Sequence, residues 1–167
     1  MIQAYTGNGK GKTTAALGLA IRAAGAGFNV YIGQFAKGQA YSELAALKKF
    51  KNIKIEQFGR SCFIGTNPGK EDVKLACNGL EKVKKVILSG KFRLLILDEI
   101  NIAIKFKLVN LGEVMAILKA APKNIEIVLT GRYACPEILK LADLVSEIKE
   151  KKHYYSKGVK ARRGIEF

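Results

Sequence analysis

The stretch Thr6-Gly7-Asn8-Gly9-Lys10-Gly11-Lys12-Thr13-Thr14 decides the fold of this chain. It follows the apolar run 1–5 and precedes the alanine-rich segment 15–24, which favours a helix, so it joins a strand to a helix. Backbone N–H groups of a glycine-rich turn at a helix N-terminus converge on anionic oxygens. Lys12 adds a positive charge, and the Thr13 hydroxyl can bind a magnesium ion. The stretch therefore predicts a phosphate loop that binds a nucleoside triphosphate.

Apolar, β-branched runs alternate with helical patterns along the rest of the chain. Strands that are apolar on both faces and separated by helices indicate a parallel sheet covered on both sides. We therefore predict an α/β protein with a three-layer RecA-like P-loop fold, a mostly parallel sheet and one domain spanning residues 1–167. The predicted strands are 2–5, 29–34, 53–58, 94–97, 125–129 and 144–148, and the predicted helices are 12–24, 42–50, 71–88, 111–120 and 136–141.

Two carboxylates follow the buried strand Arg93-Leu94-Leu95-Ile96-Leu97. Asp98 and Glu99 match the Walker B arrangement, in which an aspartate reaches magnesium directly or through water. The alternative is that these acids only cap a turn. In many hydrolytic P-loop enzymes the second acid activates water, so the motif alone leaves an ATPase open, with Glu99 in that role.

Basic residues follow other strands at the same predicted edge. Arg132, in Thr130-Gly131-Arg132, has a planar guanidinium that suits phosphate or carboxylate, the alternative being a structural salt bridge. Lys37 either contacts a phosphate or a substrate carboxylate, or is solvated. The basic, aromatic and glycine-punctuated tail 152–167 is predicted to pack back or to close over a ligand. Its His153 is a weak candidate for a general base.

The composition narrows the class of protein. Lys and Arg total 29 against 14 Asp and Glu, a net charge of +15 that suits polyanions. Basic residues interleaved with aromatic ones occur only in the tail, so nucleic acid is not the expected partner. Three widely spaced cysteines and one histidine argue against a zinc site. No run is long enough to span a membrane, and no leader pattern precedes the first strand, so we expect a cytoplasmic protein.

Five motifs, in chain order, resemble the ATP:corrinoid adenosyltransferases of cobalamin synthesis. They are T-G-N-G-K-G-K-T-T, L-I-L-D-E-I-N, L-T-G-R, A-D-L-V and K-H-Y-Y-x-K-G-V-K-A-R-R-G-I-E-F, and together they cover nearly the whole chain. The phosphate loop alone is shared with many enzymes. Its variant here, combined with the C-terminal motif, is specific to the P-loop type of adenosyltransferase rather than the unrelated helical-bundle type.

The resemblance implies a homodimeric enzyme that transfers the 5′-deoxyadenosyl group of ATP to the cobalt of a reduced corrinoid and releases triphosphate, with magnesium or manganese. Because Co(I) is itself the nucleophile, the protein need not supply one. The predicted leaving-group support comes from Lys12, Thr13 and Glu99, and the predicted metal-side residues are Thr13, Asp98 and Glu99. The predicted ATP-binding residues are Gly7, Asn8, Gly9, Lys10, Gly11, Lys12, Thr13, Thr14 and Arg132.

The corrinoid needs an apolar cleft with aromatic edges. Phe58, Cys62 and Phe63 are the candidates, and Phe63 is the candidate shield of the cobalt face. The loop departs from the family's G-F-T-W-like pattern, and the chain has no tryptophan. The preferred corrinoid is therefore open between complete cobalamin and an earlier intermediate such as cobyrinic acid diamide.

Two other activities compete with the transferase. A nucleic-acid-stimulated RecA-like ATPase is motivated by the +15 charge and the basic tail. A P-loop kinase is the third, but the sequence has no arginine-rich acceptor lid. For the transferase, the excess charge suggests an acidic, reduced flavoprotein as the electron donor.

Overall fold

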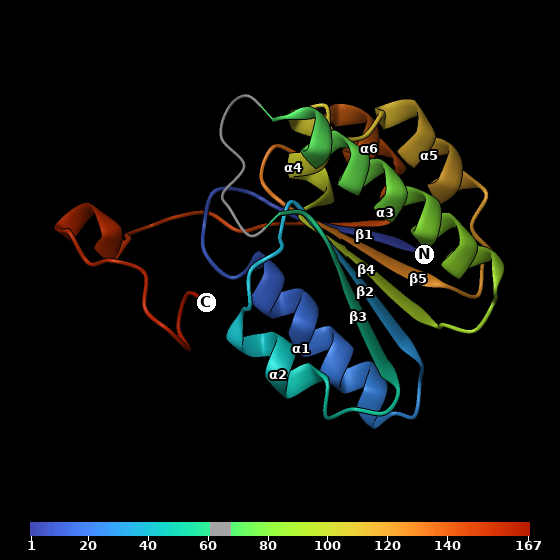
Figure 1. Ribbon diagram of the computed structural model, residues 1–167, viewed down its shortest axis with the longest axis horizontal. Helices are drawn as coiled ribbons and strands as arrows, with labels where there is room; N and C mark the ends of the chain where they lie inside the picture. Colours follow the sequence, from blue (N-terminus) through green and yellow to red (C-terminus); the bar gives the residue numbers. More distant parts are fainter. Residues whose placement is uncertain (61–67) are drawn as a thin grey trace.

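The computed structural model describes residues 1–60 and 68–167. Strands and helices alternate from the first strand onward (Figure 1). The strands are β1 (Ile2–Thr6), β2 (Val30–Phe35), β3 (Ile53–Phe58), β4 (Leu94–Asp98), β5 (Glu126–Thr130) and β6 (Leu144–Glu147). The helices are α1 (Lys12–Gly25), α2 (Ser42–Leu47), α3 (Lys70–Leu88), α4 (Ile100–Lys105), α5 (Leu111–Lys119) and α6 (Pro136–Leu141), followed by the 3₁₀ helix η1 (Tyr154–Lys157).

The six strands form one sheet in the order β3-β2-β4-β5-β1-β6. Every neighbouring pair is parallel, so the sheet is parallel throughout. Because parallel strands share one direction, the segments that follow β1, β2, β4 and β5 all emerge at the same edge. The strand order thus brings together residues 7–14, 36–37, 98–99 and 130–132, which lie far apart in the sequence.

Helices cover both faces of the sheet (Figure 1): α1 and α2 lie on one face, and α3, α4, α5 and α6 lie on the other. Strand β4 shows why both faces must be covered. Leu94 and Ile96 belong to the hydrophobic cluster under α1, whereas Leu95 and Leu97 belong to the cluster under α3 and α5. Since side chains alternate along a strand, an all-apolar strand needs a helical layer on each side.

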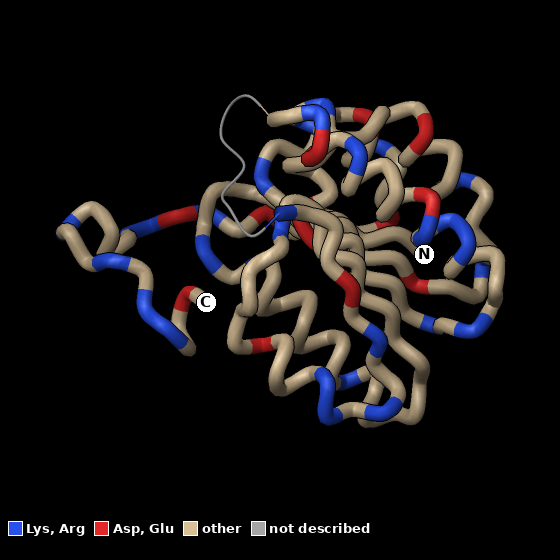
Figure 2. The backbone as a smooth tube through the Cα atoms, viewed as in Figure 1, with Lys and Arg blue, Asp and Glu red and all other residues tan. Residues whose placement is uncertain are grey.

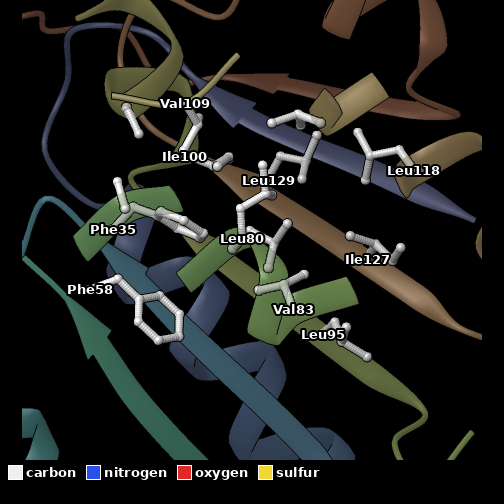
Figure 3. Close-up of a cluster of buried hydrophobic side chains, with 14 of the residues drawn as sticks. Phe35, Phe58, Leu80, Val83, Leu95, Ile100, Val109, Leu118, Ile127 and Leu129 are labelled. Carbon is white, nitrogen blue, oxygen red and sulfur yellow. The ribbon is translucent and has the colours of Figure 1, made fainter. Parts of the chain in front are cut away.

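The two layers pack differently. Beneath α1, the small residues Ala16, Ala20, Ala23 and Ala24 recur at helical spacing and let the helix approach the sheet closely. On the opposite face the core is built from larger side chains of α3 and of the strands (Figure 3). Helix α1, which begins directly after the phosphate loop, is therefore fixed against the centre of the sheet.

The predicted elements agree with the structure except at their ends and in two places. Helix α4 and the 3₁₀ helix η1 were not predicted, and α2 ends at Leu47 rather than at residue 50. The six residues of α4, Ile-Asn-Ile-Ala-Ile-Lys, have a β-branched isoleucine at every second position, which is the pattern of a strand rather than of a helix. Its Ile100 and Ala103 are nevertheless buried against the core.

The C-terminal tail extends away from the three layers and returns toward α2 (Figure 1). Lys and Arg are spread over the helices, the loops and the tail (Figure 2). Within residues 1–60 and 68–167, no helix is both long and apolar enough to cross a membrane.

Candidate active site

The phosphate loop lies between β1 and α1. Gly7 and Gly11 adopt left-handed backbone conformations, with φ of 97° and 116°. The Gly9 N–H donates to the Ile148 carbonyl (2.7 Å), and a Cβ on Gly9 would come within 2.8 Å of the same oxygen. Glycine is required here because the chain leaving β6 crosses the loop at backbone contact distance.

Lys12, the first residue of α1, is buried beneath this loop. Its ammonium group donates to the Gly9 carbonyl (2.7 Å), so the side chain folds back along the loop. Burial lowers the pKa of Lys12, and the nearby carboxylate of Glu99 opposes that shift. A cation held this close to converging N–H groups is placed to bind phosphate oxygens.

Asp98, at the end of β4, is fully buried and receives four hydrogen bonds. The hydroxyls of Thr13 and Thr130 donate to Oδ1 at 2.8 Å and 2.6 Å. Gln34 Nε2 and Lys37 Nζ donate to Oδ2 at 3.2 Å and 2.8 Å. Asp98 therefore connects the start of α1 with the ends of β2 and β5.

Glu99 follows with a left-handed backbone (φ 58°), which is unusual for a residue other than glycine. Its N–H donates to the Thr130 hydroxyl (3.0 Å), the same hydroxyl that donates to Asp98. Burial raises the pKa of the Glu99 carboxyl, and the adjacent Asp98 charge raises it further. A cation arriving beside this pair of acids would relieve that unfavourable charge.

Thr13 and Asp98 form an oxygen donor set suited to a small, hard cation. Their side-chain oxygens lie 2.8 Å apart, and Glu99 adds a second carboxylate at the same edge. Magnesium and manganese prefer carboxylate and hydroxyl oxygens together with phosphate. Among the described residues, no group of three or more His, Cys, Asp or Glu side chains forms a dedicated metal cage. The donor set therefore fits a metal ion that arrives with its nucleotide.

The other predicted ATP ligands lie around the loop at its surface. Asn8 and Thr14 are exposed, and Arg132 is exposed after β5. The charge of Arg132 acts on both Lys12 and Glu99, which places its guanidinium near the loop. Of the predicted nucleotide and metal residues, Lys12, Thr13, Asp98 and Glu99 form the inner part of the site.

Lys10 points away from that inner part and contacts the C-terminal tail. Its ammonium group donates to Glu166 Oε1 (2.6 Å) and to the Tyr154 hydroxyl (2.8 Å). The Ser42 hydroxyl, at the start of α2, donates to the carbonyl of Phe167 (2.9 Å). The tail thus contacts the phosphate loop and the start of α2 through hydrogen bonds.

His153 has a structural contact within that tail. Its Nδ1 accepts a hydrogen bond from the Tyr155 N–H (3.1 Å), capping η1, and its ring packs on Tyr154 with centroids 4.7 Å apart. This arrangement does not involve the inner site. A role for His153 as general base finds no support in these contacts.

Of the three residues predicted to line the corrinoid cleft, the structure describes Phe58. Phe58 lies in the core with 8% of its surface exposed, and its ring packs against Phe35 with centroids 5.3 Å apart. Gly79 of α3 lies directly against the same ring. Phe58 therefore does not line an open cleft, because α3 covers it. Cys62 and Phe63 lie outside the described residues.

Sequence reasoning missed several residues that organise the site. Gln34 and Thr130 both hold Asp98, and Asn101, buried in α4, donates through Nδ2 to the Gly131 carbonyl (3.3 Å). Gln34 carried a usable signal, since it is a polar residue in an otherwise apolar strand. The pairing of Lys37 with Asp98 could not be read from the sequence, because it depends on β2 lying beside β4.

A glycine-rich loop between a strand and a helix, with an aspartate at the end of another parallel strand of the same sheet, defines a P-loop nucleotide-binding protein. A solved structure of a KaiC-like protein from Pyrococcus horikoshii shares the fold, with a TM-score of 0.56 at 19% identity. That match covers 90% of this chain and 72% of the other. The predicted α/β P-loop architecture is confirmed.

The family model described as ATP:corrinoid adenosyltransferase BtuR/CobO/CobP matches residues 1–167, and the chain belongs to this family. The corrinoid adenosyltransferase of Pseudomonas aeruginosa is 34% identical over 98% of this chain and 81% of its own length. The corrinoid adenosyltransferase CobA of Salmonella typhimurium is 34% identical over all of this chain and 85% of its own length. The family predicted from the motifs is therefore confirmed.

Proposed function

We propose that this protein transfers the 5′-deoxyadenosyl group of ATP to the Co(I) ion of a reduced corrinoid and releases intact triphosphate. The observation that carries the proposal is the match of the whole chain to the corrinoid adenosyltransferase family. The structure supports it with a nucleotide site in which Lys12, Thr13 and Asp98 lie at one edge of the sheet.

The reaction forms a cobalt–carbon bond and breaks the bond between the 5′-carbon and its oxygen. The Co(I) of the substrate supplies the electron pair, and triphosphate leaves with the electrons of the broken bond. The protein therefore has to hold the 5′-carbon in line with cobalt and to stabilise the leaving triphosphate. Lys12, the loop N–H groups and Thr13 are the residues for that second task.

We assign a divalent metal, magnesium or manganese, to the Thr13 hydroxyl and the Asp98 carboxylate, with Glu99 orienting it from the adjacent position. When bound, the metal neutralises negative charge on the triphosphate. Lys10 and Arg132 lie farther out and supply additional positive charge around the phosphates. In this role Glu99 aligns no water for attack on the γ-phosphate, which separates a transferase from an ATPase.

Cys62 and Phe63 stay the candidates for the corrinoid cleft, with Phe63 as the shield of the cobalt face. We further infer a cytoplasmic homodimer that receives electrons from a reduced flavoprotein. The basis for the flavoprotein is the net charge of +15, which would attract an acidic donor. If electron delivery depends on that charge, transfer supported by the donor falls as ionic strength rises.

The test is an anaerobic reaction of the protein with Co(I) corrinoid, ATP and magnesium, followed by its visible spectrum. The expected result is a light-sensitive adenosylcorrinoid spectrum that forms far more slowly with the Lys12→Met variant. Parallel reactions without corrinoid but with DNA or RNA measure ADP release. ADP formation stimulated by nucleic acid, without the corrinoid product, would replace the transferase with a RecA-like ATPase.

A further inference from the structure

The carboxylate of Asp98 has no free position for a metal ion. A carboxylate offers about four lone-pair sites. Thr13 and Thr130 occupy those of Oδ1, and Gln34 and Lys37 occupy those of Oδ2. Since Asp98 is fully buried, water does not supply a further route to it. A metal ion that binds Asp98 directly must therefore displace one of these four donors.

The ammonium group of Lys37 occupies the position where the divalent metal ion is expected to bind. Its ammonium nitrogen lies 2.8 Å from Asp98 Oδ2 and 3.5 Å from the Thr13 hydroxyl oxygen, the two groups proposed to hold the metal. Only 15% of its side chain is exposed. The ammonium group thus forms a largely buried ion pair with the Asp98 carboxylate.

The position of Lys37 is built into the loop that follows β2. Ala36 has a left-handed backbone (φ 56°), which turns the chain immediately before the lysine. Gly59, directly after β3, lies against this turn, because a Cβ on Gly59 would come within 2.6 Å of the backbone nitrogen of Lys37. The Tyr41 ring lies 5.2 Å from the ammonium group and adds a cation–π contact. The lysine is thus held from three sides.

Of the four donors to Asp98, Lys37 is the one whose displacement by a metal ion disturbs the structure least. Thr130 and Gln34 are fully buried in the sheet, and Thr13 is itself a proposed metal ligand. Lys37 alone is charged, so a cation can replace it without leaving Asp98 uncompensated. Its flexible four-carbon stem lets the ammonium group move while the backbone stays in place.

We propose that Lys37 is a positioning residue that occupies the metal's place on Asp98 in the absence of nucleotide and is displaced by the divalent ion that arrives with ATP. The proposal rests on the proposed function only in requiring that the site binds ATP with a metal. Lys37 keeps the buried carboxylate neutralised, which lets the free enzyme fold without a metal. It also competes with the metal, which reduces the gain in ATP affinity that the metal provides.

The test is the ratio of two dissociation constants for ATP, measured by isothermal titration calorimetry in EDTA and in excess magnesium. Lys37→Met removes the charge and keeps most of the side-chain volume. Without Lys37, ATP in EDTA meets an uncompensated carboxylate and binds more weakly, whereas magnesium binds without a competitor. Both effects act in the same direction, so magnesium should improve ATP affinity at least about tenfold more in the variant than in the wild type.

Lys49→Met, at an exposed lysine beyond α2, is the matched control and should leave the ratio unchanged. Lys37→Arg keeps the cation and should also keep the wild-type ratio. If Lys37→Met does not fold, Lys37→Gln replaces it, because the amide still donates to Asp98 without carrying charge. A ratio in the charge-neutral variant that equals or falls below the wild-type ratio would overturn the proposal. The measurement contains no corrinoid, so it stands even if adenosyl transfer is not observed.

Discussion

Two carboxylates near the phosphate loop, Asp98 and Glu166, each accept several hydrogen bonds, but from partners that differ in exposure. Asp98 is fully buried at the end of β4. Glu166 lies in the C-terminal tail and accepts from Lys10, Tyr154 and Arg162. The side chains of Lys10 and Arg162 are 40% and 51% exposed. One carboxylate therefore organises the core of the site, and the other holds a surface segment against it.

Burial, rather than the number of partners, decides what a charged cluster contributes to stability. Donation from Lys10 holds the pKa of Glu166 well below its usual range. Water and salt replace its partners easily when they separate. Around Asp98 no such replacement is available, because the group left behind stays buried without a partner.

The largest expected effect on stability is that of Asp98→Ala. The substitution leaves the Lys37 ammonium and the hydroxyls of Thr13 and Thr130 without their common acceptor. Loss of one partner of a buried ion pair costs about 3–5 kcal/mol. The free energy of unfolding, measured in urea, should fall by that amount. The double variant Asp98→Ala/Lys37→Met should recover part of the loss because it removes the unpaired charge, and no recovery would contradict the buried pair.

The two lysines of the phosphate loop should differ in how much they contribute to kcat/KM for ATP. Lys12→Met removes the buried cation of the loop and should lower kcat/KM for ATP by about two orders of magnitude or more. Lys10→Met removes a lysine whose ammonium group is turned toward the tail, and should lower it only a few-fold. Both are measured in the anaerobic transfer reaction. Equal losses in the two variants would show that Lys10 turns inward when ATP binds.

Asp72, in the first turn of α3, forms an ion pair whose burial is intermediate between the pairs of Asp98 and Glu166. It is buried, but its partner Arg60 is 39% exposed, and the two form paired hydrogen bonds of 2.6 Å and 2.7 Å. Asp72→Asn should lower the free energy of unfolding by about 2 kcal/mol at neutral pH. The exposed neighbour Glu71, changed to Gln, is the matched control and should have little effect.

The Asp72 pair also predicts a pH dependence. Donation from Arg60 holds the pKa of Asp72 below its usual value of about 3.9. This stabilisation is present above that usual pKa and is lost as the pH falls through the lower pKa of the folded state. The difference in unfolding free energy between wild type and Asp72→Asn should shrink below about pH 4. A difference that stays constant to lower pH would contradict the assignment.

The smallest effect on stability is expected for Glu166→Gln. The midpoint of urea unfolding should not change, because the contacts of Glu166 lie at the surface. Trypsin should cleave within the tail, residues 152–167, several-fold faster, and 0.5 M salt should produce the same acceleration in the wild type. Glu150→Gln, in the exposed segment before the tail, is the control. A tail that resists cleavage in the variant would mean that other contacts hold it.

The sequence predicted the elements that depend on local patterns. The six strands, α1, α3, α5 and α6 follow from apolar periodicity, and the phosphate loop follows from its glycines and lysines. Helix α4 was missed because its six residues alternate like a strand, and tertiary packing of Ile100 and Ala103 decides its conformation.

The contacts of the site were predictable only where they lie within one motif. Lys12 and Thr13 belong to the loop, and Asp98 ends an unmistakably buried strand. The partners Lys37, Gln34 and Thr130 come from strands whose neighbours the sequence does not specify. The burial of Phe58 could not be predicted, because its cover, α3 with Gly79, lies about twenty residues away in the chain.

In the proposed reaction, ATP gives up its adenosyl group and leaves its three phosphates joined. ATP labelled with ¹⁴C at the 5′-carbon and ³²P at the γ-phosphate, incubated with Co(I) corrinoid, magnesium and the wild-type protein, reports both outcomes in one measurement. We expect equal amounts of ¹⁴C in the corrinoid and ³²P in intact triphosphate. Finding ¹⁴C in ADP and ³²P in inorganic phosphate would contradict it.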